Sequence, residues 1–322
     1  MRIMVTGGHG FIGSHVLVQL VDAGHEVACF DVRGPSAVAE PVADGYRFLE
    51  GDVTDAADVF DAVARFDPDR VVHLASLLGR PSERDPRGAF SVNVDGTLNV
   101  LEAADTHDVE RVVAASSSAS YGPSTGDRLT EATPQTPESV YGLTKYAVER
   151  VGRTYRDRRG IGFAAMEPLH GLGPDRHRGN VEDAYIVKAA VSGEPVSVPD
   201  LDTPIEIIYV GDEAAAFVAV TLADDLAHDR YLVGSGNRVT LSEFVDIVTE
   251  RVAGADVTLR PGREEGEYPP FPPSDCSRLR EAVGWEATLD VGEIVDTYVE
   301  WLGANPDAWT FDPSEAPWET PD

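Results

Sequence analysis

Residues 2–13 read RIMVTGGHGFIG, a short apolar run that leads into three evenly spaced glycines. Residues 2–6 predict a buried strand and residues 11–23 a helix. In the G-x-x-G-x-x-G turn between them, Gly7 permits the tight turn, Gly10 lets a diphosphate approach the backbone, and Gly13 lets helix and strand pack closely. The helix N-terminus then faces the anion. We therefore predict a dinucleotide site here; a plain tight turn is the alternative.

Short apolar runs alternate with longer amphipathic stretches through the first two-thirds of the chain, which predicts a parallel sheet covered by helices. The expected strands are 2–6, 26–31, 46–50, 70–74, 110–115 and 162–167, and the further helices are 55–65, 86–106 and 139–158. We predict an α/β fold: a Rossmann-type doubly wound parallel sheet with a smaller C-terminal substrate lobe. The expected domains are 1–167 plus 206–234 for the dinucleotide, and 168–205 plus 235–322 for the substrate.

Beyond residue 168 the pattern is more broken. We expect helices at 181–192, 212–224, 240–253 and 291–303, and strands near 195–199, 206–210 and 230–234. Residues 261–274 are rich in Pro, Gly and Glu and predict a loop.

The composition excludes several classes of function. The 322 residues are 42% hydrophobic, which supports a large core, and the net charge is −30. Such a charge repels nucleic acid and anionic membranes, so we expect neither as a partner. It is typical of adaptation to a salty cytoplasm, with a GC-rich acidic proteome as the alternative. No apolar run is long enough to span a membrane, and no Cys/His spacing suggests a metal site.

The start of the chain and its cysteines favour a cytoplasmic protein. The chain enters a strand at once, so we expect no signal peptide. Cys29 falls in a predicted buried strand and Cys276 lies far away, so both are interpreted as reduced thiols.

Two acids are expected at the adenosine half of the dinucleotide, and the first of them indicates which dinucleotide binds. Asp31 ends the second strand about 20 residues after the glycines, where an acid accepts the ribose hydroxyls and repels a 2′-phosphate. This favours NAD over NADP, although Arg33 could hold a 2′-phosphate. Asp52 follows the third strand and is expected near the adenine, with Val53 beside it. The alternative role of Asp52 is the N-cap of the helix 55–65.

Tyr141 and Lys145 are four residues apart in a chain whose 26 basic residues include two lysines. On a helix they share one face. A compact ammonium there can lower the pKa of a phenol and also bond a ribose, which a guanidinium does less well. A chance pair on a surface helix is the alternative.

Taken together, these motifs resemble the extended short-chain dehydrogenase/reductase family, the NAD-dependent epimerases and dehydratases. The resemblance covers nearly the whole chain. It is carried by TGGHGFIG (6–13), Asp31, GDV (51–53), VVHLAS (71–76), NVDGT (93–97), SSSASYG (116–122), YGLTK (141–145), YVGD (209–212) and VGW (283–285).

The resemblance implies roles for the matching residues. Tyr141 would be the general acid/base, Lys145 would orient the nicotinamide ribose and depress the Tyr141 pKa, and Ser117 would hold the substrate oxygen. Ser116 and Ser118 would be structural, and a turn or N-cap is the alternative for Ser117. The implied NAD contacts are Gly7, Gly10, Phe11, Ile12, Gly13, Asp31, Asp52, Val53, Leu74, Ala75, Ser76, Asn93, Tyr141, Lys145, Pro168 and Leu169. Family members commonly dimerise through the helices matching 86–106 and 139–158.

Departures from the family pattern concern the substrate. Members that act on nucleotide sugars usually carry Asn where this chain has His170, and Arg in the strand where it has 205–208. His170, Arg176, His177 and Arg178 form a basic cluster that we expect to bind an anionic substrate group; a solvated loop is the alternative. His73 is expected to be packed, and His9 to face solvent.

Three functions follow from these observations. The first is an NAD-dependent epimerase or dehydratase acting on a sugar or sugar nucleotide. The second is a net dehydrogenase of a small sugar, polyol or hydroxy acid, similar to L-threonine 3-dehydrogenase. The third is a non-catalytic dinucleotide sensor. A homodimer is expected because both helices carry a second apolar stripe, formed by Phe90, Val94, Leu98, Leu101, Val140, Leu143, Ala147 and Val151.

Overall fold

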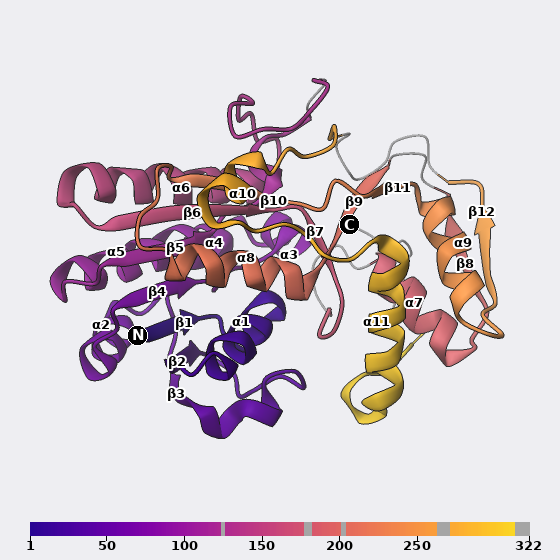
Figure 1. Ribbon diagram of the computed structural model, residues 1–322, viewed down its shortest axis with the longest axis horizontal. Helices are drawn as coiled ribbons and strands as arrows, with labels where there is room; N and C mark the ends of the chain where they lie inside the picture. Colours follow the sequence, from indigo (N-terminus) through magenta and orange to yellow (C-terminus); the bar gives the residue numbers. More distant parts are fainter. Residues whose placement is uncertain (124–125, 177–181, 201–203, 263–270, 313–322) are drawn as a thin grey trace.

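A seven-stranded parallel sheet forms the centre of the computed structural model, which describes residues 1–123, 126–176, 182–200, 204–262 and 271–312 (Figure 1). The strand order is β10-β6-β5-β4-β1-β2-β3, and all neighbouring strands are parallel. The strands are β1 (Arg2–Thr6), β2 (Glu26–Asp31), β3 (Tyr46–Glu50), β4 (Arg70–His73), β5 (Arg111–Ala115), β6 (Gly162–Pro168) and β10 (Arg230–Val233). The expected doubly wound fold is confirmed. Its strand order reverses between β1 and β4, where such sheets bind ligands.

Helices cover both faces of this sheet. On one face, α1 (Phe11–Asp22) and α8 (Val210–Leu222) share a hydrophobic cluster with β1 and β5. On the other, α2 (Ala56–Phe66), α5 (Gly96–Thr106) and α6 (Val140–Arg159) pack over a second cluster. Short turns η1 (Glu40–Gly45), η3 (Ser118–Ser120) and η4 (Pro306–Ala308) join larger elements. Within the described ranges, no helix combines the length and apolarity of a membrane crossing.

The single helix expected over 86–106 is interrupted. α4 (Pro86–Phe90) passes into one π-helical turn, η2 (Ser91–Asp95), before α5 begins at Gly96. A π turn bonds residues five apart and often occurs at functional sites. A further helix, α3 (Gly79–Arg84), precedes α4 and was not expected from the sequence.

A smaller C-terminal lobe lies beside the sheet and has its own hydrophobic core (Figure 1). Its helices are α7 (Glu182–Ser192), α9 (Leu241–Arg251) and α11 (Val291–Ala304). One three-stranded sheet joins β7 (His170–Leu172), β9 (Ile205–Tyr209) and β11 (Arg238–Val239), and a parallel pair joins β8 (Val196–Pro199) to β12 (Val257–Arg260). β7, β11, β12 and α10 (Ser277–Val283) were not expected, because such short elements leave little periodic signal.

The elements of residues 206–234 fall on both sides of the expected domain division, which stays a prediction. β9 belongs to the three-stranded sheet of the lobe, whereas α8 covers the central sheet and β10 forms its edge. The chain therefore returns to the central sheet at α8.

The apolar stripe expected on the outer face of the helices is partly core. Leu101 is fully buried, and Val151 packs against the cluster beneath α5 and α6. Phe90 and Leu143 are exposed, at 40% and 46% of their surface. The other members of the stripe, Val94, Leu98, Val140 and Ala147, are half-buried.

Candidate active site

The glycine turn after β1 is packed against backbone on two sides. Gly7 has φ +68°, and a Cβ there would lie 2.5 Å from the Ala75 backbone nitrogen. A Cβ on Gly13 would lie 2.8 Å from Gly8 Cα and 3.0 Å from the Gly7 carbonyl carbon. Real Cβ atoms essentially never come within 3.0 Å of such atoms. These two positions therefore exclude any side chain, as the sequence pattern predicts.

Gly10 is less tightly enclosed than Gly7 and Gly13. A Cβ there would meet one atom, the Gly7 carbonyl oxygen at 3.1 Å. Gly10 is the N-cap of α1, and no side chain of the described residues caps this helix. The first-turn N–H groups of Phe11, Ile12 and Gly13 have no intrahelical acceptor and remain available to an anion. The turn thus fits a dinucleotide diphosphate.

Asp31 is held against this turn at the end of β2. It is 7% exposed, and its carboxylate accepts hydrogen bonds from the backbone of His9 and of Arg33, both at 3.1 Å. The prediction that His9 faces solvent is wrong: the side chain is 5% exposed, and its ring nitrogens lie 2.6 Å from the Arg33 carbonyl and 2.9 Å from the Tyr46 hydroxyl. Arg33 itself is exposed.

Asp52 is exposed and forms a local turn, accepting from the Thr54 amide at 2.8 Å. The alternative role as N-cap of α2 is wrong, because Asp55 is the N-cap and accepts from Ala57 at 2.8 Å. Val53 is buried against Gly96 at the start of α5. Asp52 is thus left at the surface beyond β3.

Asn93 joins the segment after β4 to helix α6. It is 1% exposed in the π turn, where it accepts from the Leu77 amide at 2.7 Å and from Ser76 at 3.1 Å. Its amide donates to the Leu77 carbonyl at 3.0 Å and to Thr144 at 2.9 Å. Leu74, Ala75 and Ser76 line this segment and are half-buried. The predicted role of Asn93 at this wall agrees with these bonds, whereas Thr144 was missed by the sequence reasoning.

Ser117, Tyr141 and Lys145 come together beyond the end of β5. Ser117 follows β5 and is 9% exposed; its hydroxyl accepts from the Ala119 amide at 3.2 Å and lies near enough to Tyr141 to lower the pKa of that phenol. Tyr141 lies in the first turn of α6, whose N-cap Ser139 accepts from Gly142 at 3.0 Å. Lys145 is 3% exposed and donates from Nζ to the Ala115 carbonyl at 2.9 Å; Nζ lies 5.6 Å from the centroid of the Tyr141 ring. Lys145 is thus buried and Tyr141 half-buried, which is unlike a pair on an exposed helix face.

Burial dominates the acid–base properties of this group. It raises the pKa of Tyr141 to about 12, while the hydrogen bond with Ser117 and the charge of Arg176 act in the opposite direction. Burial lowers the pKa of Lys145 to about 7. Ser117 and Arg176 therefore favour the Tyr141 phenolate, while burial and the charge of Glu213 oppose it. The role that the sequence predicts for Lys145 stays a prediction.

Nearby polar residues have structural partners. Ser116 is 1% exposed and donates to the buried carboxylate of Glu149, and Ser118 begins the turn η3. The ring nitrogens of His73 lie 2.7 Å from Thr6 Oγ1 and 3.0 Å from Thr97 Oγ1. Burial, together with the charge of Lys145, lowers the His73 pKa to about 3, so the ring is neutral and packed, as expected.

The residues after β6 turn towards the lobe. Pro168 ends β6, and the Leu169 amide donates to Val233 at 3.0 Å while its side chain packs beside Tyr121. The ring of His170 lies 2.9 Å from the carboxylate of Asp183, an acid that the sequence reasoning missed. In the lobe sheet, Glu206 is 6% exposed and accepts from the Gly236 and Ser274 amides, both at 2.9 Å.

The predicted basic cluster is only partly described. Arg176 lies over the ring of Phe11, with Cζ 4.8 Å from the centroid. His177 and Arg178 lie outside the described residues. Arg176 lies near two acids, since its charge acts to lower the pKa of Asp183 and of Glu213. The described part of this region is thus mixed in charge rather than basic.

Glu213 is a buried acid that the sequence reasoning missed. It is 1% exposed at the start of α8, packed against Gly171, and its Oε2 has no hydrogen-bond partner among the described residues. Burial raises its pKa to about 8. The available signal was an acid followed by three alanines at the start of an apolar helix.

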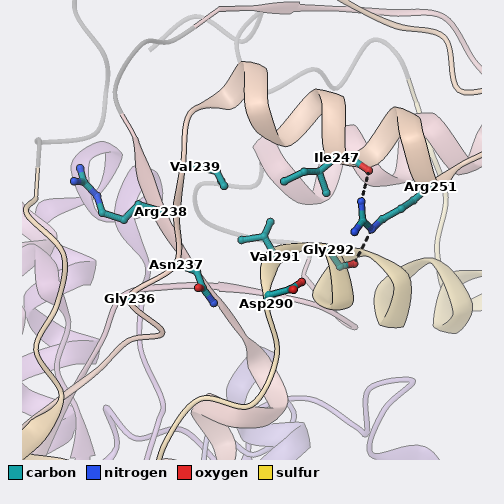
Figure 2. Close-up of a pocket in the computed structure, with 9 residues that line it drawn as sticks. All are labelled: Gly236, Asn237, Arg238, Val239, Ile247, Arg251, Asp290, Val291 and Gly292. Carbon is teal, nitrogen blue, oxygen red and sulfur yellow. Dashed lines mark hydrogen bonds between the residues drawn. The ribbon is translucent and has the colours of Figure 1, made fainter.

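A separate open cavity of about 400 Å³ lies in the lobe, away from Tyr141 (Figure 2). Arg251 lines this cavity, and its guanidinium donates to the Gly292 carbonyl at 3.1 Å and to the Ile247 carbonyl at 3.3 Å. The cavity contains none of the predicted site residues.

Comparisons with known proteins agree with this geometry. The model of the NAD dependent epimerase/dehydratase family matches residues 3–234. The UDP-glucose 4-epimerase of Mycolicibacterium smegmatis is 28% identical over 94% of this chain and 98% of its own length. The low-salt glycan biosynthesis protein Agl12 of Haloferax volcanii is 29% identical over 89% of this chain and 93% of its own. The crystal structure of the UDP-glucose 4-epimerase of Thermus thermophilus in complex with NAD is 30% identical, with a TM-score of 0.84 over 93% of this chain and 98% of that one. The chain therefore belongs to the NAD-dependent epimerase/dehydratase family of enzymes, whose cofactor is NAD.

Proposed function

We propose that this enzyme is an epimerase of a nucleotide sugar, with Tyr141, Ser117 and Lys145 as its catalytic residues. The observation that carries the proposal is the position of Lys145, which is 3% exposed with Nζ 5.6 Å from the centroid of the Tyr141 ring, together with the nearby Ser117, which lowers the pKa of Tyr141. A phenol, a hydroxyl and an amine converge there at the ends of parallel strands, which is where such sheets bind ligands. Relatives named as UDP-glucose 4-epimerases over nearly their full length support the same choice.

Each residue has a separate task in this proposal. Tyr141 accepts the proton of a sugar hydroxyl and later returns it, which is general acid/base catalysis. Ser117 donates to the same sugar oxygen and holds it at the phenol. Lys145 bonds the nicotinamide ribose through the amine that also contacts Ala115. When bound, NAD supplies the hydride acceptor.

The turn of glycines and Asp31 would hold the two ends of the adenosine diphosphate. Gly10 leaves room for the diphosphate at the helix N-terminus, and the Asp31 carboxylate retains lone pairs for the ribose hydroxyls, since each oxygen can accept more than one hydrogen bond. Asn93 and Thr144 would act indirectly, by fixing the segment after β4 against α6.

A net dehydrogenase is the second candidate, and two observations favour it. His170, which replaces the usual Asn of nucleotide-sugar enzymes, is engaged with Asp183 at 2.9 Å. Glu206, beside the position of the usual Arg, is occupied by two backbone amides. Neither arrangement offers the usual contacts to a nucleotide diphosphate, so a smaller substrate is the alternative.

One experiment separates the candidates. The enzyme is incubated with NAD and UDP-glucose, UDP-galactose, UDP-N-acetylglucosamine or dTDP-glucose, and with small polyols, while products are followed by NMR and NADH by absorbance. An epimerised sugar without net NADH supports the proposal, and stoichiometric NADH supports the dehydrogenase. Tyr141→Phe is the control and should lose about 10²–10⁴ in rate while still binding NAD. No turnover of any substrate by the wild type would favour the non-catalytic sensor.

A further inference from the structure

Arg176 lies over the dinucleotide-binding helix rather than over the lobe. Its guanidinium is 4.8 Å from the ring centroid of Phe11, the first residue of α1. Arginine favours this stacking because its planar guanidinium still presents N–H donors to an anion at the edge of the plane. A cation is thus placed beside the helix turn whose amides face the diphosphate.

The backbone that presents Arg176 is held by the same part of the protein. The Pro174 carbonyl is 3.4 Å from the ring of His15 in α1, and Asp175 accepts from the Val38 amide at 3.2 Å, in the segment after β2. From the lobe, Lys188 donates to the Arg176 carbonyl at 3.2 Å. Residues 174–176 are therefore held between α1, the segment after β2 and α7.

The charge of Arg176 also reaches Tyr141. It acts to lower the pKa of Tyr141, while the guanidinium packs on Phe11. The same charge acts to lower the pKa of the Asp183 and Glu213 carboxyls. Arg176 is thus near both Tyr141 and the start of α1, the two places where the nicotinamide and the diphosphate of NAD are expected.

We propose that Arg176 binds the diphosphate of NAD beside the N-terminus of α1. This differs from the anionic-substrate role that the sequence suggests for Arg176. It rests on NAD binding at residues 7–13 and not on which sugar is turned over.

The test measures binding, so it is independent of turnover. Arg176→Ala, Arg176→Lys and the control Arg65→Ala, whose side chain is 63% exposed near the end of α2, are titrated calorimetrically with NAD and with ADP-ribose, which has the diphosphate but no nicotinamide. A charge-assisted hydrogen bond contributes about 1.5–3 kcal/mol, so Arg176→Ala should weaken both ligands about 10- to 100-fold. Arg176→Lys should lose less, and Arg65→Ala should change ADP-ribose affinity less than threefold. The salt dependence of ADP-ribose binding should also become shallower in Arg176→Ala.

Melting temperatures confirm that each variant is folded before titration. ADP-ribose affinity within twofold of wild type in a folded Arg176→Ala would overturn the proposal, and a raised substrate KM alongside it would assign Arg176 to the substrate. A wild type that binds neither NAD nor ADP-ribose would also overturn it, whatever the sugar assays show. If no sugar substrate is turned over but Arg176→Ala weakens ADP-ribose binding as expected, this inference stands and the proposed function is rejected.

Discussion

Replacing Gly13 by alanine should lower both the stability of the fold and the affinity for NAD, because backbone atoms occupy the position of the added methyl group. Its Cβ would lie 2.8 Å from Gly8 Cα, whereas ordinary contact begins at 3.4 Å. Helix α1 and the turn must therefore separate by more than 0.6 Å (3.4 − 2.8). All three close neighbours are backbone atoms, so no side-chain rotation relieves the overlap. Overpacking of this kind costs about 1–3 kcal/mol.

The same displacement moves the first-turn amides of α1 away from a diphosphate. A hydrogen bond is lost over a few tenths of an ångström, so we expect NAD affinity to fall at least about tenfold. For a chain of this size, 1–3 kcal/mol should lower Tm by roughly 2–10 °C. Both quantities follow from one clash and should change together.

Gly10→Ala is the matched comparison. Its Cβ would meet the Gly7 carbonyl oxygen alone, at 3.1 Å, a smaller overlap than at Gly13, and its φ of −83° suits any residue. The protein without ligand should therefore lose less Tm than Gly13→Ala does, while NAD affinity falls because the methyl group fills the space for the diphosphate. Gly303→Ala, with no atom within 4 Å, controls for a glycine change in a helix and should change neither NAD affinity nor, by more than a few degrees, Tm.

Scanning calorimetry and calorimetric NAD titration measure the three variants side by side. Gly13→Ala with the Tm and NAD affinity of the wild type would refute the packing argument. Gly10→Ala that binds NAD normally would refute the position of the diphosphate while leaving the packing argument intact.

Four further outcomes are expected. Lys145→Arg should lose most activity while keeping its charge, because the larger guanidinium does not fit a side chain 3% exposed at the Ala115 carbonyl; a pH–rate profile identical to wild type would remove Lys145 from the mechanism. The wild type should be a dimer by light scattering in molar KCl and Leu143→Asp a monomer, since Leu143 is 46% exposed on the outer face of α6; a monomeric wild type contradicts this. Tm should rise steeply with KCl and then level off, because the Debye length shortens from about 30 Å at 0.01 M to about 3 Å at 1 M and screens the charge of −30; a flat or falling Tm rejects adaptation to salt. The Tm of Glu213→Gln relative to that of the wild type should rise between pH 5 and pH 8. The folded-state pKa of Glu213 is raised to about 8, so the native carboxyl binds its proton more tightly than the unfolded one, and the wild type loses stability as pH rises through this range. An equal Tm difference at both pH values would show that Glu213 does not titrate there.

Local signals in the sequence determined the parts of the protein that depend on near neighbours. The glycine spacing after residue 6 predicted both the turn and its position at the end of β1. Short apolar runs predicted the first six strands of the sheet to within a residue or so at most ends. Strands buried on both faces give such runs, which holds for these strands except β3, where most residues are exposed or half-buried. Tyr141 and Lys145 were paired correctly because residues four apart on a helix share a face.

Tertiary structure alone decided where polar groups are buried and which of them meet. His9 is buried because Tyr46, 37 residues away, approaches its ring, and Asn93 reaches Leu77 and Thr144 because a π turn rotates it there. Arg176 meets Phe11, and Glu213 packs on Gly171, through contacts between segments far apart in sequence. Periodicity indicates which face of an element is apolar, but it does not indicate which residues distant in sequence that face will contact. The charge environment of the site was therefore set by the fold, and the sequence pattern could locate the site without describing it.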